Sequence, residues 1–165
     1  MTNVQLRAGR NSDLAGVGDL HYRSRAAAYR DILRPETLTF GGDGRLSEWW
    51  TERWKWEQTT HRLTVATADD ELVGFTYIGP THDDGVLELY AIHVDPAHVG
   101  TGVGRLLMED ALTHLGPHAV LWVLPRNTRA RRFYEQGGWH PDGASRVETM
   151  GNEKVEHIRY TLRRP

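Results

Sequence analysis

The chain has 165 residues, a length typical of one domain with a single hydrophobic core. Charged residues make up 25% of it and the formal net charge is −2, so nothing in the composition favours nucleic acid as a partner. The absence of cysteine excludes a thiol nucleophile, a disulfide framework and Cys-ligated metal sites. The first ten residues contain no apolar stretch that could form a signal peptide, and no long apolar run follows. We expect one cytoplasmic domain, residues 1–165, with no membrane partner.

The first third of the chain predicts one strand and two helices. Val4–Arg7 has a strand pattern, and Asn11 or Ser12 then caps a helix that continues towards Leu33, where Arg34-Pro35 ends it. Residues 46–57 form a second helix that contains Trp49, Trp50, Trp54 and Trp56. These tryptophans are candidates for an acceptor pocket or a homodimer contact, although an aromatic stripe at helical spacing more often belongs to a core.

From position 61 the pattern alternates between strands and helices. Residues 63–66 and 72–78 predict a hairpin around Asp69-Asp70, and residues 86–94 predict a strand near the middle of the sheet. A helix from 103 to 115, a strand over 119–124 and a helix from 127 to 136 follow. Strands near 139–140 and over 155–162 complete the chain. This order predicts an α/β fold with a mixed sheet.

The segment around Gly100, Gly102 and Gly104 joins a strand to a helix. Glycines at alternate positions let backbone N–H groups at a helix start approach an anion, so this loop is a candidate phosphate site, with Arg105 as an added charge. Its spacing excludes a mononucleotide P-loop, which needs a nearby lysine, and the dinucleotide fingerprint G-x-G-x-x-G. A glycine-rich helix start without any ligand is the alternative.

Two motifs in the right order resemble the GCN5-related N-acetyltransferase (GNAT) superfamily. The first is Val94-Asp95-Pro96 followed by Val99-Gly100-Thr101-Gly102-Val103-Gly104. The second combines Asn127, Ala130, Phe133 and Tyr134 with Gly138-Trp139. Val99 stands where the family usually has Gln or Arg, which implies weaker binding of the cofactor diphosphate unless Arg105 or His98 compensates.

The resemblance implies a mixed, mostly antiparallel sheet flanked by helices, with splayed central strands and one acetyltransferase domain over residues 1–165. It implies acetyl-CoA as cosubstrate and no metal. The implied cofactor-binding residues are Ile92, His93, Val94, Val99, Gly100, Thr101, Gly102, Val103, Gly104, Arg105 and Asn127. The backbone of residues 92–94 would pair with the pantetheine arm and direct an N–H at the thioester oxygen.

The same resemblance implies direct attack by an amine, which needs a general base because alkylamines are protonated near neutral pH. Glu88 is the candidate base, since strand alternation would place it on one face with Tyr90, Ile92 and Val94. A strand carboxylate paired with an arginine is the alternative. Some relatives carry the base on the next strand, where this chain has Trp122. Tyr134 is the candidate acid that protonates the leaving thiolate, and its alternative is a core role.

The acceptor is less well defined by the sequence. Tyr22, Arg25 and Tyr29 lie on the first helix and are candidates for the acceptor pocket. The arginines at 126, 129, 131 and 132 are read as a solvated helix face, from which one could reach the 3′-phosphate of CoA. We expect transfer to a primary amine of a small molecule or of a peptide or protein. A non-catalytic CoA-binding sensor or interaction module is the alternative, and an RNA-acetylating toxin is disfavoured by the charge.

Overall fold

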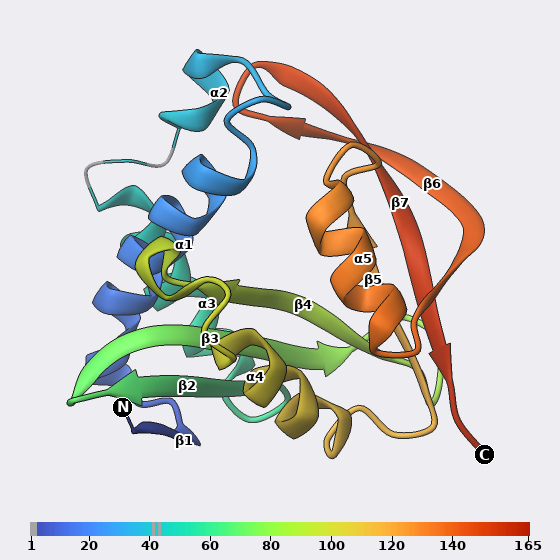
Figure 1. The fold of residues 1–165 in the computed structure, drawn as a ribbon, viewed down its shortest axis with the longest axis horizontal. Coiled ribbons are helices and arrows are strands. Elements are labelled where there is room, and N and C mark those ends of the chain that lie inside the picture. The colour runs from blue at the N-terminus through green and yellow to red at the C-terminus, as the bar shows by residue number, and fades with distance from the viewer. Residues whose placement is uncertain (1–2, 41, 43) are drawn as a thin grey trace.

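The computed structural model describes residues 3–40, 42 and 44–165, which fold around one mixed sheet (Figure 1). Its strands are β1 (Val4–Ala8), β2 (Arg62–Ala68), β3 (Glu71–Pro80), β4 (Leu87–Val94), β5 (His118–Val123), β6 (His140–Met150) and β7 (Glu153–Arg163). Its α-helices are α1 (Leu14–Ala28), α2 (Pro35–Leu38), α3 (Arg45–Glu57), α4 (Val103–Leu112) and α5 (Thr128–Gln136). The spatial order is β1-β2-β3-β4-β5-β7-β6, in which only the β4–β5 neighbours are parallel. The expected mixed, mostly antiparallel sheet is confirmed.

The two central strands separate soon after they meet. β4 and β5 pair only at Leu87 with Ala119 and at Glu88 with Val120, and beyond these residues they have no register with each other. On its other side β4 carries a bulge, because Tyr77 of β3 pairs with Ala91 and Ile78 pairs with Leu89, which leaves Tyr90 without a partner in β3. The splayed central strands predicted from the family resemblance are therefore present.

Helices cover both faces of the sheet. On one face Leu20 of α1 and Trp50 of α3 pack with Phe75 and Tyr77 of β3. On the other face α4 packs over β3 and β4 and shares a core with β5 and α5 (Figure 1). Gly74 of β3 permits the close approach of α4, since a Cβ there would lie 2.8 Å from Cδ1 of Leu107.

Two predicted elements differ from the structure. The first helix was expected to reach Leu33, but α1 ends at Ala28, and Pro35 starts the short helix α2. Proline suits that first helical position because it needs no N–H donor there. The strand expected near 139–140 extends to Met150 as an exposed edge strand that pairs with β7.

The tryptophans of α3 divide between the core and the surface. Trp50 is 2% exposed, packs edge-on against Phe75 and Tyr77, and donates to Nδ1 of His21 at 3.0 Å. Trp49 and Trp56 are 47% and 78% exposed. The helical stripe is therefore part core and part surface.

Candidate functional site

The gap between β4 and β5 opens into a cleft with a volume of about 1230 Å³. Residues 89–94 of β4 form one wall, and Trp122 and Val123 of β5 form another. The C-terminal end of α1 and one side of both α4 and α5 complete the lining. Because β4 pairs with β5 at only two residues, the backbone groups of the rest of β4 that face β5 have no strand partner. Such groups need hydrogen bonds from water or a ligand.

The glycine loop lies on this cleft at the start of α4. Gly100 and Gly102 have φ of +81° and +96°, and Gly102 is the N-cap of α4. A Cβ at either position would meet no heavy atom of the described residues within 4 Å, so both glycines leave open space at the helix start. The first N–H groups of a helix have no partner within it and carry a partial positive charge. The loop can therefore hold an anion.

The other residues of this loop are placed differently. Val99 and Gly104 line the cleft with Gly100 and Gly102, whereas Val103 is buried in the core beneath α4. Thr101 is exposed outside the cleft lining. Arg105 is exposed at the rim and lies 3.3 Å from Glu109.

Helix α5 brings Asn127 and Tyr134 to the same cleft. Oδ1 of Asn127 accepts the N–H of Ala130 at 3.3 Å, so the expected cap is present, and the residue also lines the cleft. Tyr134 packs against the core under α4 and lines the cleft as well. Burial raises its pKa strongly, with a smaller contribution from Tyr29, so the phenol is protonated at neutral pH. Within the described chain its hydroxyl makes no hydrogen bond, which leaves it free for a ligand.

Ile92, His93 and Val94 of β4 all line the cleft. The rings of His93 and His21 are tilted by 36° with centroids 4.5 Å apart, and Nδ1 of His93 lies 2.9 Å from Oγ of Ser24. Burial, with a smaller effect from the Arg25 charge, lowers the pKa of His93 to about 4. The imidazole is therefore neutral at physiological pH and is no source of positive charge for phosphate.

Glu88 lies in the last residue pair before β4 and β5 separate, and it is outside the cleft lining. The expectation that it shares a face with Ile92 and Val94 is wrong, because the bulge at Tyr90 breaks the alternation. Leu87, Leu89 and Ile92 pack on the α4 side, whereas Tyr90 packs on the α1–α3 side, the side to which Glu88 points. Burial raises the pKa of Glu88, and the charges of Arg146 and Arg53 lower it to a smaller extent.

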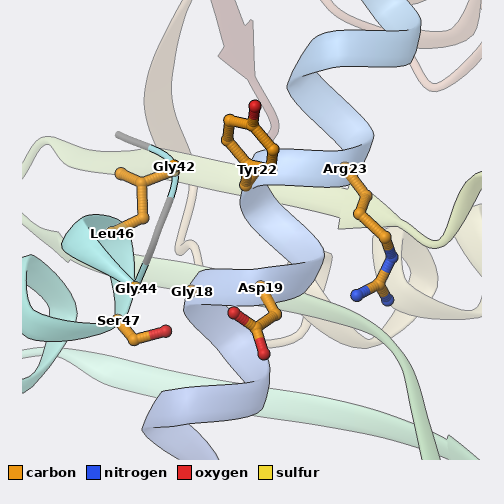
Figure 2. A pocket seen from close by; sticks show the side chains of 8 residues that line it. All are labelled: Gly18, Asp19, Tyr22, Arg23, Gly42, Gly44, Leu46 and Ser47. Atoms are coloured by element: carbon orange, nitrogen blue, oxygen red, sulfur yellow. The ribbon is translucent and has the colours of Figure 1, made fainter. Parts of the chain in front are cut away.

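The three acceptor candidates on α1 do not lie together. Tyr29 lines the large cleft. Tyr22 lines a separate cavity of about 150 Å³ between α1 and the start of α3, and Figure 2 shows it there with Asp19, Leu46 and Ser47. The guanidinium of Arg25 is largely buried and donates to the carbonyl of Phe40. Tyr22 and Arg25 are thus outside the cleft lining.

Sequence reasoning missed several residues of the cleft. Tyr90 and Trp122 line it on opposite strands, and Arg30 and Arg129 bring positive charge to its mouth. Arg131 was expected to be solvated, but its Nε donates to the Tyr160 hydroxyl at 2.8 Å. Alternation along β5 could have suggested that Trp122 lines the cleft. Arg30 lies there because of the tertiary arrangement, which no local sequence pattern encodes.

Two negative findings apply to the described residues. They contain no group of three or more His, Asp or Glu side chains arranged to hold a metal ion. In the same residues no helix has both the length and the apolar composition to cross a membrane.

Comparison with known proteins identifies the family. Residues 26–139 match the acetyltransferase (GNAT) family. The chain belongs to this family. The chain is 28% identical to the probable N-acetyltransferase Rv2775 of Mycobacterium tuberculosis, over 99% of this chain and 95% of that protein. It is 39% identical to the peptidyl-lysine N-acetyltransferase YjaB of Salmonella typhimurium, over 54% of this chain and 57% of that one.

A solved structure supports the fold. The PaiA N-acetyltransferase of Thermoplasma acidophilum, determined in complex with coenzyme A, superposes with a TM-score of 0.79 at 17% identity. The match covers 98% of this chain and 99% of that one. Family membership and the N-acetyltransferase relatives make this GNAT protein an acetyl-CoA-dependent N-acetyltransferase.

Proposed function

We propose that the protein, acting as one domain over residues 1–165, transfers the acetyl group of acetyl-CoA directly to a primary amine held at the β4–β5 opening. The observation that carries this proposal is the cleft itself, which joins an anion-binding helix start to unpaired backbone on β4 and to a free phenol. Acetyl-CoA is an intracellular metabolite, so we place the reaction in the cytoplasm.

The glycine loop suits the diphosphate of the cosubstrate. The open space at Gly100 and Gly102 and the N-terminus of α4 offer backbone N–H groups, which do not depend on the side chain at position 99. Val99 is 39% exposed and apolar, so it adds no charge. Arg129 and Arg30 lie at the same mouth and supply positive charge that the family's usual Gln or Arg would otherwise give.

Strand β4 suits the pantetheine arm and the thioester. Its unpaired N–H groups beyond Glu88 can hydrogen-bond to amides of the arm and to the thioester oxygen as negative charge develops on it. Donors fixed in a strand need no reorganisation during the reaction, and this rigidity gives them their catalytic value.

Proton transfers fall to Glu88 and Tyr134. Glu88 takes a proton from the acceptor ammonium, directly or through water, because only the neutral amine attacks the thioester. The amine nitrogen then bonds to the carbonyl carbon, the C–S bond breaks, and Tyr134 donates a proton to the leaving sulfur. The nitrogen loses its second proton to water, and water returns a proton to Tyr134. The high pKa of Tyr134 keeps the phenol protonated until the thiolate forms.

A non-catalytic CoA-binding sensor is the second candidate, and Val99 favours it because an apolar side chain there weakens the phosphate site. The test mixes purified protein, acetyl-CoA and a panel of primary amines, and measures free thiol release and acetylated product by mass spectrometry. Amine-dependent thiol release supports the enzyme. Acetyl-CoA binding with no transfer to any amine contradicts the proposed catalysis and favours the sensor.

A further inference from the structure

Two aromatic residues lie near the point where the central strands separate. From the last paired residues, Glu88 and Val120, two further positions along each parallel strand lead to Tyr90 on β4 and Trp122 on β5. Both rings line the cleft. Leu121 and Val123 pack on the α4 side, so Trp122 between them points to the opposite face, as Tyr90 does. The rings therefore flank the opening on the side away from the core of α4.

Arginines surround these rings, but each has its own carboxylate. Cζ of Arg146 lies 4.1 Å from the centre of the Trp122 ring, and Nη2 of Arg146 lies 2.5 Å from Glu148. Arg159, whose Cζ is 5.8 Å from the same ring, pairs with Asp142 at 2.6 Å. On the other wall Arg53 lies 4.9 Å from the Tyr90 ring and pairs with Glu57. In each of these three pairs the carboxylate neutralises the charge of its arginine.

Glu88 is a carboxylate near these rings that has no arginine partner of its own. It makes no ion pair or hydrogen bond with the described residues, although Arg146 and Arg53 are near enough to act on its pKa. His61 contacts Glu57, and because burial lowers the pKa of His61 it adds no positive charge at about pH 8. Beside Tyr90 and Trp122, Glu88 therefore contributes a negative charge that no described ion pair offsets. A single ammonium group complements that charge.

The tip of the β6–β7 hairpin reaches α2 (Figure 1). Glu153 accepts from Oγ1 of Thr37 at 2.8 Å and lies 3.4 Å from Nε of Arg34. Tyr29, which lines the cleft, packs in the same apolar cluster as Leu33 and Val155. This packed contact places the hairpin tip and α2 next to the cleft residue Tyr29, where a small molecule needs less room than an extended peptide.

We propose that the acceptor is a small monoamine with an aromatic body, whose ring lies against Trp122 and Tyr90 while its nitrogen meets Glu88. This inference rests on the proposed acetyl transfer and names its substrate class. The ammonium loses two protons, one released through Glu88 and one that balances the proton given to sulfur; its nitrogen bonds to the acetyl carbon, the C–S bond breaks and CoA leaves as the thiol. A carboxylate next to the amine would repel Glu88. The extra ammonium groups of a polyamine would lack a carboxylate of their own, because Glu57, Glu148 and Asp142 already pair with arginines.

The experiment compares tryptamine with tryptophan, spermidine and a lysine peptide at about pH 8, with saturating acetyl-CoA. Tryptamine and tryptophan differ only in the α-carboxylate. We expect kcat/KM for tryptamine to exceed that for each of the others by roughly tenfold or more, which corresponds to about 1.4 kcal/mol or more, because the others bring an unfavourable charge to the site. A higher value for tryptophan, spermidine or the peptide overturns the assignment.

Two variants test whether the acceptor binds against the Trp122 ring. Trp122→Leu should raise KM for tryptamine roughly tenfold through loss of the ring contact, with the Kd for acetyl-CoA unchanged. Trp56→Leu is the matched control, because Trp56 is exposed on α3 and lies outside the cleft lining, and it should change neither constant. An unchanged KM in Trp122→Leu refutes the proposed ring contact.

The outcomes separate this inference from the function on which it rests. Transfer to other amines with none to tryptamine refutes the aromatic monoamine and leaves the N-acetyltransferase intact. Acetyl-CoA binding without transfer to any amine refutes both.

Discussion

Replacing Gly102 with leucine tests whether the first turn of α4 holds the diphosphate of acetyl-CoA. At φ +96° an L-residue costs about 1–2 kcal/mol of folding free energy. No heavy atom of the described chain lies within 4 Å of a Cβ built at this position, and Gly102 lines the cleft. The new side chain therefore enters the cofactor space without displacing the core.

The two consequences are separable by thermal unfolding. The backbone cost lowers Tm of the ligand-free variant by roughly 2–8 °C, at about 2–4 °C per kcal/mol for a chain of this size. Acetyl-CoA at about 100 times its Kd should stabilise the wild type by about 2.7 kcal/mol, or roughly 5–11 °C. We expect Gly102→Leu to lose this rise.

Gly116→Leu provides the matched control. Gly116 follows the other end of α4, has φ of +70° and also leaves open space for a side chain, but it lies outside the cleft lining. Its ligand-free Tm should fall by a similar amount while the rise with acetyl-CoA persists. A full rise in Gly102→Leu would refute the placement of the diphosphate at this turn.

Three further predictions concern ionisable groups near the cleft. Tyr134→Phe should lower kcat by about 10²–10⁴-fold and leave the Kd for acetyl-CoA unchanged, because the ring remains and only the proton donor is lost; a wild-type kcat would return Tyr134 to a core role. Glu88 acts as a base only when ionised, so kcat/KM should rise with pH through the pKa of Glu88, which burial raises. Glu88→Gln should lower kcat/KM and abolish this rise with pH, and a rise that persists in the variant would assign the base to another group. For His93, a folded pKa of about 4 below the usual value near 6.5 means that the fold favours the neutral ring, so stability is fully present above about pH 6.5 and falls below it, by about 2 kcal/mol between pH 7 and pH 5. Urea unfolding of wild type and His93→Asn at both pH values measures this, and an equal loss in the two proteins would contradict it.

Features set by nearby residues could be predicted from the sequence. Asn127 caps α5 through a bond to an N–H three residues away, and Gly102 begins α4 at the expected place. Pro96 follows the end of β4 as expected. Each of these signals depends on the backbone angles or hydrogen bonds of a few consecutive residues, which a sequence displays directly.

Strand β6 could not be predicted in the same way. Pro141 and Gly143 read as a loop, and most of the strand is exposed, so the sequence shows no buried alternation. Its register with β7 shifts between Pro141 and Ser145, which accommodates these residues at the edge of the sheet. The strand forms because β7 offers a partner, and that partner is a property of the fold.

The bulge at Tyr90 is the clearest case of a site feature that the sequence pattern did not predict. Period-two alternation places Glu88 and Ile92 on one face, which would put the carboxylate on the α4 side. One unpaired residue between them reverses the faces, so Glu88 points to the α1–α3 side while Ile92 packs under α4. If the amine and the thioester enter from opposite sides of the sheet, as we propose, they can meet only where the sheet is open. The bulge and the β4–β5 separation occur within two residues of each other, and together they place Glu88, the proposed base, beside that opening.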